Sequence, residues 1–142
     1  MTQIDFYTQV DDKLRTACRL ATKAYGQNLR VMVLCPDADT ALRFDRMLWT
    51  MSALGFVPHC RANDALAART PIVIDHQGAE PPHDEVLLNL GDEWPPYFSR
   101  FRRLLEIVTT DDEDRRAARA RYKFYKDRGY ELKTHDLSGA AQ

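Results

Sequence analysis

The stretch RRAARARYKFYKDRG, residues 115–129, concentrates cationic and aromatic side chains that could bind an anion. Seven of its fifteen residues are Lys or Arg, although the whole 142-residue chain has a formal net charge of −1. On a helical period of 3.6 residues, one stripe carries Arg115, Arg119, Tyr122 and Lys126. Arginines beside an aromatic ring suit a carboxylate next to an apolar group. The stripe therefore indicates a site for an acidic peptide with a hydrophobic end, or for single-stranded nucleic acid.

The same stripe also fits a merely solvated helix face. A second stripe carries Ala117, Ala120 and Phe124, and we expect it to face the core. The cationic stripe would then point away from the sheet. If the face were only solvated, Tyr122 would expose an apolar ring to water, and this favours a binding role.

A second candidate surface lies in LWTMSALGFVPH, residues 48–59. Trp49 falls off the helical stripe that we expect to be buried, and three apolar residues follow the end of that helix: Phe56, Val57 and Pro58. Such a cluster, if exposed, is typical of the core of a protein interface. The alternative is that these side chains only close one end of the domain.

Enzymatic chemistry has weaker support in this sequence. Neither GxGxxG nor GxxxxGK[ST] occurs, so we expect no bound nucleotide cofactor. The three cysteines lack CxxC spacing and the four histidines are dispersed, so we expect no metal site. The alternative function is a nucleotide- or phosphate-metabolising enzyme that uses strand ends near Cys35–Asp39 and Asp75–His76. Pro36 argues against it, because it removes a backbone amide that an oxyanion at Cys35 would need.

The elements that must position these residues alternate between strand and helix patterns. We expect strands at 4–8, 30–35, 71–75, 86–91, 105–109 and, as an edge, 130–136. We expect helices at 11–26, 37–54, 92–106 and 111–129, the third beginning at a double proline. Pro58 argues against a central strand at 56–60. This order predicts a three-layer α/β domain with a mainly parallel sheet and helices on both faces.

Length and composition are those of an ordinary soluble domain. We expect one domain, 1–142, with a core of about 4–137 and a frayed C-terminal tail. No apolar run is long enough for a membrane helix and no signal peptide is recognisable, so we expect a cytoplasmic protein. The near-zero net charge argues against a broad DNA-wrapping surface.

Two motifs resemble a known family. RARYKFYKDRGYEL (119–132) is similar to the C-terminal helix signature of the chi subunit of bacterial DNA polymerase III. FVPH (56–59), the upstream Trp49 and the opening FY (6–7) also resemble that family, over about residues 4–137. The resemblance implies a Rossmann-like fold without a nucleotide site. It also implies a non-enzymatic accessory subunit of the clamp-loader assembly.

The resemblance further implies two protein partners on separate faces. One is the acidic C-terminal tail of single-stranded-DNA-binding protein (SSB), which ends in Phe with a free carboxylate. The other is the psi subunit, for whose surface a helicase competes in some bacteria. DNA would then be reached mainly through SSB, although a direct single-stranded-DNA-binding module remains an alternative.

Residue by residue, the resemblance assigns the two faces as follows. Arg119 and Tyr122 match the arginine and tyrosine of the family that bind the SSB tail, and Arg115 matches another basic position. Lys123 is adjacent, and Lys126 completes the stripe. The psi or helicase surface would use Trp49, Phe56, Val57 and Pro58. Ala120 departs from one relative in the family, which carries an acid between two arginines, and this makes the patch more positive.

Overall fold

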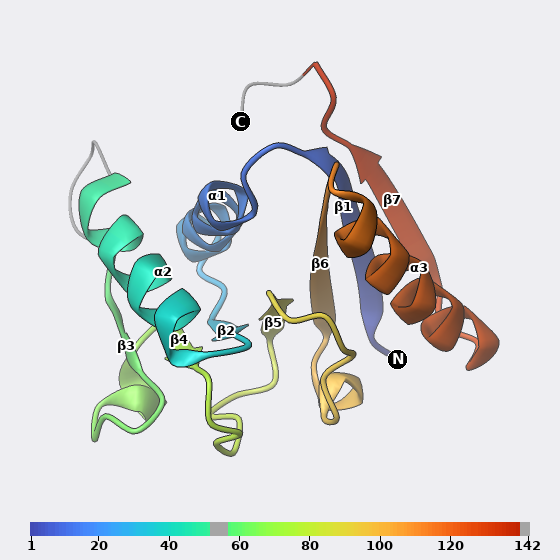
Figure 1. Ribbon diagram of the computed structural model, residues 1–142. Helices are drawn as coiled ribbons and strands as arrows, with labels where there is room; N and C mark the ends of the chain where they lie inside the picture. The colour runs from blue at the N-terminus through green and yellow to red at the C-terminus, as the bar shows by residue number, and fades with distance from the viewer. Residues whose placement is uncertain (52–56, 140–142) are drawn as a thin grey trace.

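Seven parallel strands form one sheet in the computed structural model, which describes residues 1–51 and 57–139. The strands lie in the order β3-β4-β2-β5-β6-β1-β7 (Figure 1). Their bounds are β1 (Gln3–Val10), β2 (Val31–Leu34), β3 (His59–Arg61), β4 (Ile72–Asp75), β5 (Val86–Asn89), β6 (Arg103–Thr109) and β7 (Leu132–Asp136). The helices are α1 (Lys13–Gly26), α2 (Ala38–Met51) and α3 (Asp112–Asp127). The predicted α/β fold with a parallel sheet is confirmed.

Helices cover both faces of this sheet, as predicted. Val31 and Val33 point into the core beneath α1 and α2, whereas Met32 points into the core beneath α3. A strand buried on both faces needs apolar side chains at every position, which explains the uninterrupted run in β2. α1 and α2 therefore share one face, and α3 covers the other (Figure 1).

The ends of the elements follow local sequence signals. The carboxylate of Asp12 accepts from the backbone N–H of Arg15 and caps α1, and Asp111 caps α3 in the same way. β3 and β7 are the two edge strands. Pro58 immediately precedes the edge strand β3. This agrees with the prediction that Pro58 argues against a central strand at 56–60. Residues 52–56, which include the end of the predicted second helix, and residues 140–142 of the tail lie outside the described residues.

The predicted helix at 92–106 is wrong. Only a 3₁₀ turn, η2 (Phe98–Arg100), forms there, and β6 already begins at Arg103. Leu104 and Leu105 are both buried because a strand paired with β1 and β5 sends them to opposite faces of the sheet. A helix would bury them on one side only, so sheet pairing overrides the local pattern. Phe98 and Phe101 are nevertheless buried.

The predicted core face of the last helix is also wrong. α3 turns Ala118, Arg121 and Tyr125 toward the sheet, in place of Ala117, Ala120 and Phe124. The cause is a buried acid on β6: Glu106 is fully shielded from solvent. Arg121 Nε donates to its Oε1 at 3.1 Å, and the Tyr125 hydroxyl donates to its Oε2 at 2.6 Å.

Neighbouring polar groups complete this buried network. Asn89 Nδ2, on β5, lies 3.1 and 3.2 Å from the two carboxylate oxygens of Glu106. Arg121 Nη1 donates to the carbonyl of Asp92 at 2.8 Å, and Asn89 Nδ2 to that of Glu93 at 3.0 Å. The network thus fixes α3 and the segment after β5 against the same acid.

No helix within the described ranges is long and apolar enough to cross a bilayer. The cytoplasmic location stays a prediction.

Glu106→Gln should strongly destabilise the protein, because the guanidinium of Arg121 would remain buried without a counter-charge. We expect a loss of about 3–5 kcal/mol in the free energy of unfolding. For a domain of this size that loss lowers the melting temperature by roughly 10 °C. Thermal unfolding followed by circular dichroism measures it.

The control is Lys123→Met, which breaks the exposed Lys123–Asp127 pair on the same helix. That change should cost no more than about 1 kcal/mol. Equal melting temperatures for Glu106→Gln and Lys123→Met would show that the buried pair does not hold α3.

Candidate functional site

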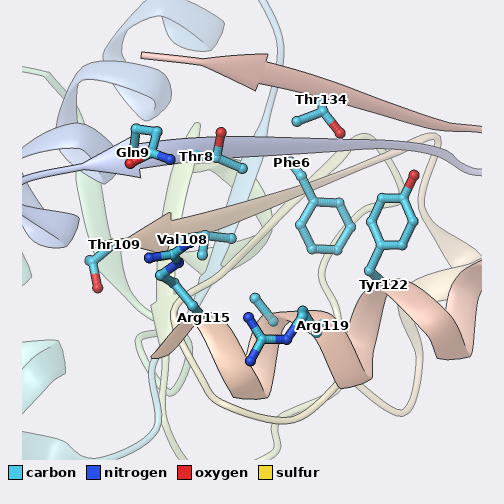
Figure 2. Close-up of a pocket in the computed structure, with 10 residues that line it drawn as sticks. Phe6, Thr8, Gln9, Val108, Thr109, Arg115, Arg119, Tyr122 and Thr134 are labelled. Atoms are coloured by element: carbon cyan, nitrogen blue, oxygen red, sulfur yellow. The ribbon is translucent and has the colours of Figure 1, made fainter. Parts of the chain in front are cut away.

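A hollow of about 370 Å³ lies where α3 crosses the strands β6, β1 and β7 (Figure 2). Its floor is apolar, because Phe6, Val108 and Ala118 are all buried there. Polar side chains surround this floor: Thr8, Gln9, Thr109, Arg115, Arg119, Tyr122 and Thr134. We call this hollow, with its ten lining residues, the α3 pocket.

Two arginines and a tyrosine of the predicted stripe belong to the α3 pocket. Arg115 and Arg119 lie one turn apart, are exposed, and form no ion pair with any residue that the structure describes. Tyr122 is half-buried and packs against Phe6, with ring centroids 5.3 Å apart and an interplanar angle of 61°. The prediction that the stripe points away from the sheet is therefore wrong for these three residues. The correct core face, set by Arg121 and Glu106, turns the stripe toward β1.

The two lysines assigned to the same site do not line the α3 pocket. Lys126 lies exposed near the end of α3. Lys123 is exposed, and its ammonium contacts the carboxylate of Asp127 at 2.7 Å. The structure thus brings together Arg115, Arg119 and Tyr122, and leaves both lysines on the surrounding surface.

Asp114 holds the start of α3 at the pocket. Its Oδ2 accepts from the backbone N–H and the hydroxyl of Thr109, at 2.8 and 3.0 Å. Its Oδ1 lies 2.7 Å from the ammonium of Lys13 on α1. Burial works against the charge, but these contacts outweigh it and lower the pKa of Asp114. The carboxylate therefore joins α3 to the end of β6 and to α1.

The opposite wall comes from β1, which the sequence analysis did not assign to the site. Alternation along a strand could have placed Phe6 and Thr8 on the same face. Gln9 could not have been found in this way. Its φ is +59°, in the left-handed region, and the pairing of β1 with β6 shifts register between Tyr7 and Val10. This bulge brings Gln9 to the rim.

The second predicted surface centres on Trp49, whose side chain is 62% exposed. Its ring lies edge-on to that of His59, with centroids 5.0 Å apart. Leu42, seven residues earlier on α2, falls on the same stripe and is also exposed. Val57 is buried in the core and Pro58 is partly exposed, while Phe56 lies outside the described residues.

His59 fixes the strand beneath Trp49 to α2. Its Nε2 lies 2.9 Å from Asp45 Oδ1, and its Nδ1 lies 2.7 Å from the carbonyl of Val57. Arg61 Nε donates to the other oxygen of Asp45 at 3.2 Å. The histidine therefore has a structural role here.

The residues of the alternative enzymatic site do not form a reactive centre. Cys35 is buried, and burial raises the pKa of its thiol to about 12, so that almost none is thiolate at neutral pH. The carboxylate of Asp75 accepts from three backbone amides of the following loop. Within the described part of the chain, no three His, Cys, Asp or Glu side chains are grouped to hold a metal.

Comparison with known proteins decides the family. The family model described as DNA polymerase III chi subunit, HolC, matches residues 1–133. This chain belongs to that family. DNA polymerase III subunit chi of Pseudomonas aeruginosa is 35% identical over 143 residues, covering 96% of this chain and 98% of that protein. DNA polymerase III subunit chi of Escherichia coli is 28% identical over 134 residues, covering 94% and 89%. The chi subunit is a non-catalytic accessory subunit of the polymerase.

Asp114→Asn should destabilise the protein at pH 7, and the difference should shrink in acid. A carboxyl whose pKa is lowered by folding stabilises the protein above its unfolded pKa of about 3.9. That contribution is lost as the pH falls through the lower pKa of the folded state. Urea unfolding at pH 7 and pH 3 measures the change, with Asp112→Asn, an exposed acid on the same turn, as control. A deficit of equal size at both pH values contradicts this role.

Cys60 should be the only thiol of the native protein that reacts quickly with a disulfide reagent at pH 8. Cys18 and Cys35 are buried and their thiol pKa values are raised to about 12, whereas Cys60 is partly exposed. All three should react in urea, and Cys60→Ser should abolish the fast phase. A fast Cys35 in the Cys60→Ser variant would restore the enzymatic alternative.

Proposed function

We propose that this chi-family protein is an adaptor between SSB and the clamp-loader assembly. The α3 pocket binds the acidic C-terminal tail of SSB, and the surface around Trp49 binds psi or a helicase. The protein would thereby hold the polymerase on template DNA that SSB covers. Family membership supports the replicative setting.

The observation that carries the tail assignment is the pairing of free guanidiniums with an apolar hollow. Arg115 and Arg119 have no anionic partner in the described chain, and Phe6 and Ala118 form an apolar floor beside them. A peptide that ends in Phe offers both complements, a ring for the floor and a carboxylate for the guanidiniums. Preceding aspartates would extend along the cationic surface toward Lys123 or Lys126.

The surface around Trp49 supports the second contact. Trp49 and Leu42 are exposed apolar side chains on one stripe of α2, and exposed tryptophan is enriched where interfaces concentrate binding energy. The stripe lies on the sheet face opposite α3, so the two partners would not compete for space.

Arg119→Ala should weaken binding of an SSB-like peptide about tenfold, because it removes one of two charged donors at the pocket. The ligand is a fluorescent acidic peptide ending in Asp-Ile-Pro-Phe with a free carboxylate. Its fluorescence anisotropy is measured at low and high salt. Binding should weaken with salt, as expected for a contact dominated by exposed charges.

Two controls make the result specific. Arg116→Ala removes an exposed arginine of the same helix that does not line the α3 pocket, and it should leave affinity nearly unchanged. The same peptide with an amidated C-terminus should bind much more weakly to the wild type. Equal affinities for Arg116→Ala and Arg119→Ala, or for the free and amidated peptides, would contradict the assignment.

A further inference from the structure

α1 carries a row of cations that the proposed function does not use. Arg15, Arg19 and Lys23 follow one another at intervals of four residues and therefore lie on one face of the helix. α1 contains no acidic residue, and none of the three cations forms an ion pair within the described ranges. By contrast, Lys13 at the start of the same helix is paired with Asp114.

This row does not stabilise the helix that carries it. Like charges four residues apart each cost a few tenths of a kcal/mol, and the row contains two such pairs. The helix dipole favours Lys23 in the last turn but disfavours Arg15 in the first turn, so it gives the row no clear net gain. The arrangement is therefore explained better by a ligand than by helix stability.

The row borders a hollow of about 630 Å³ between α1 and α2. Cys18, Leu48 and Met51 contribute apolar lining, and Thr22 adds an exposed hydroxyl. None of the described residues that line this hollow is aromatic. A ligand here would thus meet cations and hydroxyls.

We propose that the α1 row binds the phosphate backbone of single-stranded DNA. Successive cations are about 6 Å apart along the helix axis, so the row is about 12 Å long. This length is greater than the size of one phosphate or one carboxylate and suits a linear polyanion. Lysine acts as a point charge that suits phosphate, and Thr22 can donate to a phosphate oxygen. Contacts to phosphate oxygens carry no sequence information, so the contact is independent of base sequence.

The location of the row complements the α3 pocket. α1 and α2 cover one face of the sheet and α3 covers the other, so a DNA strand and an SSB tail can be bound at once (Figure 1). A replication subunit that holds an SSB tail would then also contact DNA next to SSB. The inference rests on membership of the polymerase family and on the row itself, and does not require the tail assignment.

The experiment measures the fluorescence anisotropy of a labelled oligothymidylate of twelve nucleotides as the full chain is added, at salt concentrations from 20 to 200 mM. For three phosphate contacts, we expect the logarithm of the binding constant to fall with the logarithm of the salt concentration with a slope of about −2. Each contact to a single strand contributes about −0.7 to that slope. Arg15→Glu/Arg19→Glu/Lys23→Glu should weaken binding at 20 mM salt at least tenfold. Arg15 and Lys23 are exposed and Arg19 is partly exposed, and circular dichroism checks that the variant folds.

The matched control is Arg69→Glu/Arg102→Glu/Arg116→Glu, which changes the net charge equally at exposed cations elsewhere. It should retain most of the affinity for DNA. Equal losses in the two triple variants, or no DNA binding by the wild type at 20 mM salt, overturn the proposal. So does loss of DNA binding in Arg119→Ala alone, which would assign the DNA to α3.

The SSB-like peptide separates this proposal from the adaptor function. The α1 triple variant should bind the peptide as the wild type does. If the wild type binds DNA through α1 but not the peptide, the adaptor proposal fails and the α1 proposal stands. If poly-glutamate binds the row and DNA does not, the ligand is an acidic peptide and the α1 proposal fails.

Discussion

The buried ion pair between Glu106 and Arg121 determines how the last helix lies on the sheet. Both side chains are almost completely shielded from solvent, and Tyr125 and Asn89 satisfy the remaining carboxylate lone pairs. A charge in a protein core is tolerated only when it is paired and hydrogen-bonded, so few rotations of α3 are compatible with this acid. The observed rotation turns Arg115, Arg119 and Tyr122 toward β1, where Phe6 completes the α3 pocket. The α3 pocket therefore depends on a buried contact outside its own lining.

The side chains of the RARYKFY segment of α3 have two different structural roles. Within RARYKFY, Arg119 and Tyr122 line the α3 pocket, whereas Arg121 and Tyr125 hold the helix on β6. Arginine density along the sequence is therefore a poor measure of the surface charge, because one arginine of the stretch is buried. Phe124 has a third environment, stacked on Trp94 with ring centroids 3.7 Å apart.

Patterns that depend on one element alone were predictable from the sequence, whereas those that depend on pairing between distant elements were not. The run at β2 and the stripes on α1 and α2 follow from local periodicity, and the parallel order follows from alternation of strands and helices. The prediction of a helix at 92–106 failed because pairing within the sheet places Leu104 and Leu105 in a strand. The prediction of the α3 core face failed because an arginine is expected at the surface unless its buried partner is known. Likewise, Phe6 and Gln9 reach the pocket from the other end of the chain.

The central claim is that the terminal Phe of an acidic tail occupies the α3 pocket, and NMR contacts between peptide and protein test it most directly. In a complex with isotope-labelled protein, the ring protons of that Phe should show nuclear Overhauser contacts to the Ala118 methyl and to the rings of Phe6 and Tyr122. The Nε–H signals of Arg115 and Arg119 should shift on titration, while that of buried Arg121 should remain in place. Contacts to the Trp49 surface or to the α1 row, with the α3 signals unchanged, would contradict the account.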